Sequence, residues 1–113
     1  MQPGEIYLAH FPFGGGPGTK LPPVLLLTPP IGSVPEVLVA YISSVMPASP
    51  LPSDIVLDPS QSEHAGTNLK TVSVVRLHKL ATIHRRSLVR YLGELSTSTS
   101  AEVASRLRVL LGL

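Results

Sequence analysis

The sequence has no cysteine, few aromatic residues and no long hydrophobic run. Without cysteine there are no disulfides and no thiolate chemistry, and the four histidines do not have the spacing of a zinc motif. The longest apolar runs, such as VLLL at 24–27, are far too short to span a bilayer core of about 30 Å. We therefore expect a cytoplasmic protein with no membrane segment and no bound metal or other cofactor.

Several familiar motifs are also missing. The first residues, MQPGEIYLAHF, lack the cationic and apolar regions of a signal peptide. The stretch GGGPGT at 14–19 lacks the GK[ST] ending of a phosphate-binding loop, and there is no GxSxG elbow of a hydrolase. Hydroxyl, imidazole and guanidinium groups remain, and these can act on RNA, whose 2′-hydroxyl supplies a nucleophile.

A length of 113 residues favours a single domain over residues 1–113. β-Branched and apolar patterns predict strands at 6–11, 24–28, 37–43, 54–57, 72–83 and 89–93. Thr99 and Glu102 have the spacing of a capping box, so we expect a closing helix that ends before Gly112. The fold class is α+β: a small, strongly bent antiparallel sheet or partly open barrel with a C-terminal helix.

Positive charge is concentrated in the second half of the chain. Residues 70–90 contain six cations and no carboxylate, whereas residues 1–60 contain Lys20 and four carboxylates. Such a segment can attract a polyanion or an acidic partner, although a solvated face with free counterions explains it equally well.

The order of the segments resembles the PemK/MazF family of toxin endoribonucleases. GEIYLAHFPF resembles the opening strand of that family, KLPPVLLL its Arg-Pro step and second strand, and VLVAYISS the strand that ends in Thr-Ser. SDIVLD, TNLKTVSVVRLHKLATIH and YLGELS follow in the same order before the closing helix. The resemblance spans essentially the whole chain.

This resemblance implies an SH3-like barrel, a homodimer and metal-independent cleavage of single-stranded RNA. It also implies a cognate antitoxin whose acidic tail covers a basic groove. The arginine of the family falls on Pro22 and is missing here, whereas the threonine falls on Ser43, which keeps a hydroxyl. A lysine cannot reproduce the bidentate fork of arginine, yet Lys20 is the nearest cation in the sequence.

The predicted catalytic residues are therefore Lys20, Ser43 and His10. Each has a plainer interpretation: a solvated loop cation, a polar strand end and an exposed or structural imidazole. The predicted RNA-binding residues are Arg76, His78, Lys79, Arg85 and Arg86, acting together as a charged surface. Phe11 and Phe13 are expected to anchor the core and a loop, with base stacking as the alternative.

Two further functions remain open. Loss of the arginine at position 22 suggests a non-catalytic member that still binds RNA or an antitoxin. The same barrel can also carry a toxin that acts on a protein such as a topoisomerase, because fold does not fix function.

Overall fold

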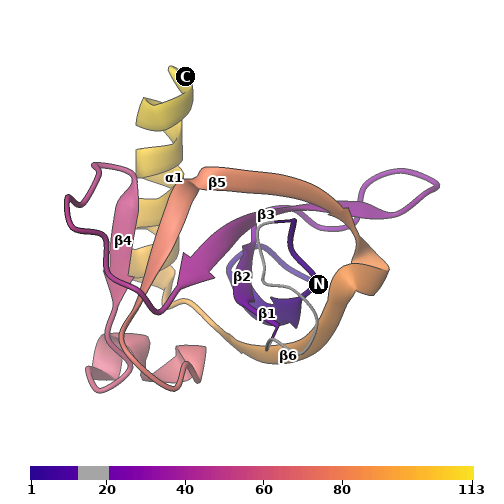
Figure 1. Ribbon diagram of the computed structural model, residues 1–113. Helices are drawn as coiled ribbons and strands as arrows, with labels where there is room; N and C mark the ends of the chain where they lie inside the picture. Colours follow the sequence, from indigo (N-terminus) through magenta and orange to yellow (C-terminus); the bar gives the residue numbers. More distant parts are fainter. Residues whose placement is uncertain (13–20) are drawn as a thin grey trace.

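The computed structural model describes residues 1–12 and 21–113, which form a bent sheet, two short 3-10 helices and one α-helix (Figure 1). The strands are β1 (Glu5–Ala9), β2 (Pro23–Leu26), β3 (Glu36–Ser43), β4 (Asp54–Leu57), β5 (Ser73–His84) and β6 (Leu88–Glu94). The helices are η1 (Ser62–Thr67), η2 (Arg85–Ser87) and α1 (Thr97–Leu111).

The strands form one antiparallel sheet in the order β4-β5-β3-β2-β1-β6. The long strand β5 arches over the molecule and continues through η2 into β6, which pairs with β1 (Figure 1). No ladder joins the edge strands β4 and β6 within the described residues, so the barrel-like sheet stays open. The predicted fold class, a strongly bent antiparallel sheet with a C-terminal helix, is confirmed.

Both faces of the sheet bury apolar side chains. The helix-side cluster comprises Ile6, Leu25, Ala40, Ile42, Ile55, Leu57, Leu69, Val75, Leu77, Leu95 and Val103. The opposite-face cluster comprises Ala9, Phe11, Val24, Leu26, Val37, Val39 and Ile83. Successive residues of a strand point to opposite faces, so the continuous apolar runs of β2 and β3 reflect burial on both sides.

Strand β5 bulges where it crosses the middle of β3. Ala40 of β3 pairs with Leu80, but the next residue, Tyr41, pairs with Arg76. Residues 77–79 therefore have no partner in β3, and β5 turns a corner there. The sequence predicts the strand but not this corner, because its residues look like uninterrupted strand.

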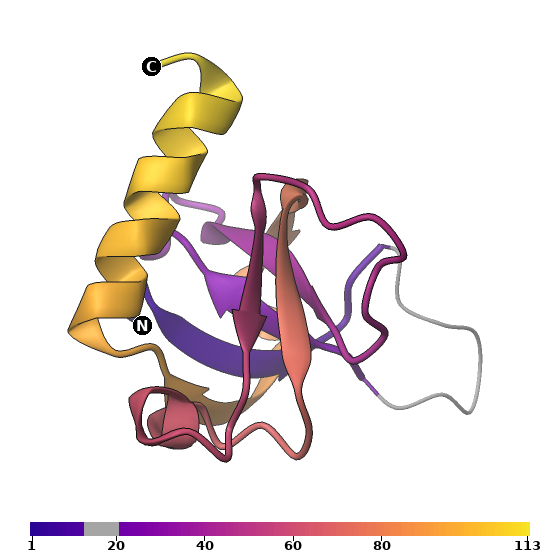
Figure 2. The ribbon, with the colours of Figure 1, turned by 90° about the vertical axis from the view of Figure 1, so that its left-hand side faces the viewer.

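Helix α1 packs along one side of the sheet, and its C-terminal end projects beyond the strands (Figure 2). Its N-cap is Ser96, whose backbone is extended and whose Oγ accepts the N–H of Thr99 at 3.1 Å. The predicted capping box of Thr99 and Glu102 is wrong, because Thr99 is buried inside the first turn and Glu102 pairs with Arg106. The predicted end is confirmed, since Gly112 caps the helix in the left-handed region at φ 72°.

A single carboxylate ties η1 to the start of α1. Oε1 of Glu63 accepts hydrogen bonds from the hydroxyls of Ser96 (2.5 Å), Ser98 and Thr99 (3.0 Å). These hydrogen bonds lower the pKa of Glu63 to about 2. The segment between β4 and β5 thus contains a short helix that braces α1.

Acid should weaken this contact. The pKa of Glu63 is lower in the folded protein than its ordinary value of 4.5. The contribution of this carboxylate to stability is therefore complete above pH 4.5 and is lost as the pH falls toward 2. We expect the difference in free energy of unfolding between wild type and Glu63→Gln to shrink over this range, measured by urea unfolding. Glu94→Gln, at an exposed site, is the control, and a difference that does not change with pH would contradict the assignment.

A glycine in β6 permits close packing against η1. A Cβ added at Gly93 would lie 2.7 Å from the carbonyl oxygen of Thr67 and closer still to that of Gly66. We expect Gly93→Ala to destabilise the protein by about 1–3 kcal/mol, because backbone on both sides must move. Thermal unfolding of Gly66→Ala is the comparison, since its Cβ would be 3.7 Å from the nearest backbone atom, and equal effects would contradict this account.

Candidate functional site

One end of the sheet brings together the two positions that correspond to the catalytic pair in the resemblance. Val24 of β2 pairs with Tyr41 of β3, and extending this register by two residues places Pro22 opposite Ser43. The end of β1 adjoins them, because the N–H of Ala9 donates to the carbonyl oxygen of Pro22 at 3.1 Å. Pro22 precedes β2, so positions 22 and 43 lie at the same end of the β2-β3 pair, just beyond its last paired residues.

The hydroxyl of Ser43 lies at the last residue of β3 and is partly exposed. Its Oγ accepts the N–H of Val45 at 3.1 Å and is 3.4 Å from the carbonyl oxygen of the same residue. This turn holds the hydroxyl at the strand end, where it can donate to a ligand oxygen.

An aromatic and cationic cluster lies beside Ser43 on the same face of the sheet. Tyr41 precedes Ser43 by two residues, and its ring is 5.2 Å from the ring of Phe11, centroid to centroid. The ammonium of Lys79 lies 5.6 Å from the centroid of Tyr41, within the range of a cation–π contact. We call Phe11, Tyr41 and Lys79 the Tyr41 cluster.

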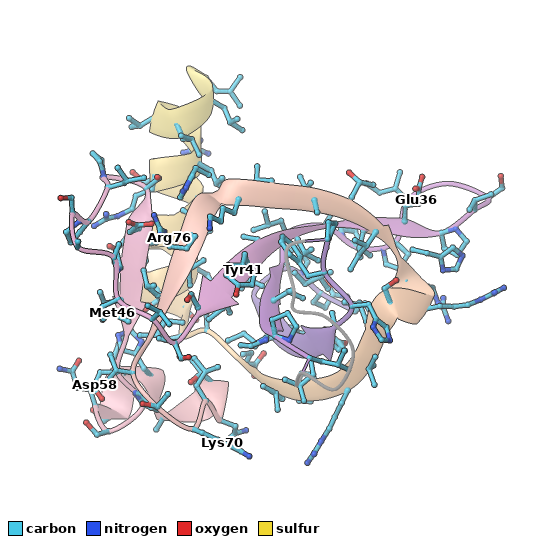
Figure 3. The ribbon with its side chains drawn as sticks, viewed as in Figure 1. Glu36, Tyr41, Met46, Asp58, Lys70 and Arg76 are labelled. Carbon is cyan, nitrogen blue, oxygen red and sulfur yellow. The ribbon has the colours of Figure 1, made fainter. Side chains whose placement is uncertain are left out.

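Arg76 is held by a carboxylate. Its Nε donates to Oδ1 of Asp54 at 2.7 Å, and Oδ2 of Asp54 accepts the N–H of Leu51 at 2.8 Å. The side chain of Asp54 is 2 % exposed and that of Arg76 is 16 % exposed. Figure 3 shows Arg76 near Tyr41, its partner in the ladder between β3 and β5. Arg76 thus adds less free positive charge to this surface than the sequence suggests.

The other predicted cations do not converge on Ser43. The backbone of Arg85 binds the carbonyl oxygen of Pro35, just before β3, so η2 adjoins the opposite end of that strand. The eight residues of β3 separate these ends by roughly 20 Å. Arg86 lies in the same short helix η2 and is exposed.

The predicted histidines are both exposed. His10 follows β1, and its N–H donates to the carbonyl oxygen of Ser87 at 3.0 Å, so it lies between η2 and the Ser43 end. His78 lies at the corner of β5 and is also exposed.

Lys20 and Phe13 lie outside the described residues. Within the described ranges, no three metal-ligating side chains form a group that could hold an ion.

The match to a family decides what kind of protein this is. Residues 2–111 match the family described as the PemK-like, MazF-like toxin of type II toxin-antitoxin systems. The chain belongs to this family. The resemblance seen in the order of the strands is therefore confirmed, and a search of curated proteins by sequence gave no significant match.

Solved structures with the same fold are consistent with this family membership. The Mycobacterium tuberculosis toxin MazF-mt6 is 25% identical with a TM-score of 0.72, and the match covers 96% of this chain and 97% of that one. An endoribonuclease in complex with its cognate antitoxin, from a mycobacterial species, is 18% identical with a TM-score of 0.69, covering 100% and 96%. A MazE-MazF structure from Deinococcus radiodurans is 21% identical with a TM-score of 0.66, covering 99% and 95%.

Sequence reasoning missed two residues near the site of this MazF-like toxin. Tyr41 looks like an ordinary strand aromatic, and only the bulge of β5 brings Lys79 onto its ring. Asp54 looks like the polar start of a strand, but it is a buried partner of Arg76. The lack of any carboxylate within residues 70–90 hinted that a cation there would need a partner from elsewhere.

Removing that buried carboxylate should destabilise the fold. We expect Asp54→Asn to lower the free energy of unfolding by about 3–5 kcal/mol, because Arg76 would be left as a largely buried, unpaired charge. Urea unfolding measures the loss. Glu102→Gln, which breaks the exposed pair with Arg106, should cost about 0–1 kcal/mol, and similar costs for the two variants would contradict this account.

Proposed function

We propose that this protein is the toxin of a type II toxin-antitoxin system and acts as a metal-independent endoribonuclease on single-stranded RNA. The observation that carries the proposal is the end of the β2-β3 pair, where Ser43 and Pro22 lie beside the Tyr41 cluster. This is a hydroxyl, an aromatic ring and a cation at one strand end, in a chain of the MazF-like toxin family.

The proposed reaction uses the 2′-hydroxyl of the substrate. Its oxygen attacks the adjacent phosphorus, the bond to the 5′-oxygen of the next nucleotide breaks, and a 2′,3′-cyclic phosphate forms. Solvent water accepts the proton of the 2′-hydroxyl, and the 5′-oxygen gains a proton, which exposed His10 can supply. Ser43 donates to a non-bridging oxygen, and Lys20 stabilises the negative charge.

The partners follow from the same family membership. Solved structures with the same fold include an endoribonuclease in complex with its cognate antitoxin and a MazE-MazF structure. We propose that an antitoxin with an acidic tail binds this chain as well, with the unpaired cations of β5 and η2, including Arg85 and Arg86, as its attraction. We also propose a homodimer and a cytoplasmic location, where RNA is available. No helix of the described residues is long and apolar enough to cross a bilayer.

Cleavage of a long single-stranded RNA in the presence of a chelator tests the activity. We expect wild type to cut and Ser43→Ala to lose about 10²- to 10³-fold in rate, as for removal of one donor to developing charge. Ser44→Ala, one residue along and exposed, is the matched control and should retain its rate.

Lys20→Ala tests whether that lysine takes the place of the family's arginine. An unchanged cleavage rate would remove Lys20 from the mechanism.

A non-catalytic relative is the competing function, and Pro22 in place of arginine favours it. It predicts RNA or acidic-peptide binding that weakens with salt and yields no product, because phosphate contacts release counterions. Absence of cleavage at high protein concentration, beside an active arginine-bearing relative, would reject the nuclease and leave this alternative.

A further inference from the structure

The bulge of β5 changes the face on which Lys79 lies. Leu77 and Leu80 both pack in or against the helix-side cluster, although they are three positions apart and strict alternation would place them on opposite faces. The reversal between them carries the Lys79 side chain to the other face, where its ammonium meets the ring of Tyr41. An uninterrupted strand would direct Lys79 to the same face as Leu77.

The ring of Tyr41 is well placed for a flat ligand. It is half-buried, packs on buried Phe11, and lies on the same face of β3 as Ser43, roughly 6.6 Å along the strand. Its hydroxyl makes no hydrogen bond within the described residues. The ring of Tyr41 is therefore fixed by packing against a buried aromatic ring and is also contacted by a flexible, charged side chain.

We propose that the Tyr41 cluster is a nucleotide subsite that sets which base flanks the cleaved bond, a role that rests on the proposed function. The base of a single-stranded RNA stacks on Tyr41, and Lys79 leaves the ring to bind the phosphate of the same nucleotide. Stacking on an aromatic ring suits any base, so the preference among bases is modest and comes from differences in stacking strength. Tyr41 and Lys79 act here as specificity-determining residues, and Ser43 remains the catalytic one.

Tyrosine emission offers a direct readout, because the chain has no tryptophan and only three tyrosines. The probe is a single-stranded 2′-deoxy oligonucleotide of mixed sequence, which lacks the nucleophilic hydroxyl and cannot be cut by the proposed route. We expect the probe to quench the emission of one tyrosine and to leave the emission of the other two unchanged. Tyr41→Leu should abolish the quenching, whereas Tyr91→Leu, at an exposed residue that contacts Tyr7, should retain it.

Binding and cutting patterns complete the test. Tyr41→Leu should weaken probe binding about 5- to 150-fold and flatten the preference among cut sites in a long RNA, while Tyr41→Phe keeps both near wild type. Lys79→Gln should lower the slope of log affinity against log salt by about 0.7, the value for one phosphate contact on a single strand. Thermal unfolding shows whether each variant is folded. If Tyr41→Leu does not fold, quenching of the wild type and the salt dependence of Lys79→Gln test the subsite.

The outcomes separate this inference from the proposed function. If wild type cuts RNA but is not quenched, or folded Tyr41→Leu binds and cuts as wild type does, the subsite is wrong and the nuclease stands. If wild type does not cut but is quenched through Tyr41, the subsite stands and the nuclease is wrong. If wild type neither binds nor cuts, both are overturned.

Discussion

Strand β3 is the constraint on which the rest of the structure depends. It pairs with β2 on one edge and β5 on the other, and it buries apolar side chains on both faces. A strand fixed in this way cannot shift its register by one residue without exchanging its two buried faces. Its last residue, Ser43, is therefore held at a defined place opposite Pro22, and the geometry of the candidate site follows from this burial.

The bulge in β5 is the second constraint, and it links packing to chemistry. The corner allows one strand to cover both halves of β3 and bend the sheet around its core. The same corner reverses side-chain direction and brings Lys79 to Tyr41. A feature that shapes the fold thus also brings a cation to the face that carries Ser43.

Charge is distributed unevenly over this fold. Arg76 is matched by the buried carboxylate of Asp54, whereas Lys79 and the cations of η2 have no carboxylate partner among the described residues. Matched charge stabilises the corner of β5, and unmatched charge is available to a polyanion or an acidic tail. The basic segment seen in the sequence therefore contains one structural ion pair, a lysine over the ring of Tyr41, and the exposed arginines of η2 near the start of β3.

The sequence by itself determined the strands, the closing helix and the family, because apolar runs, turn residues and their order are local signals. It also predicted Ser43 as a site residue and Pro22 at the position of the family's arginine, and both stay predictions. Only the tertiary structure decided that Ser96 caps the helix, that Asp54 holds Arg76 and that Lys79 covers Tyr41. The physical reason is that these contacts join residues far apart in the sequence or choose among neighbouring hydroxyls of one segment. The bulge that reverses the faces of β5 also has no local sign in its residues.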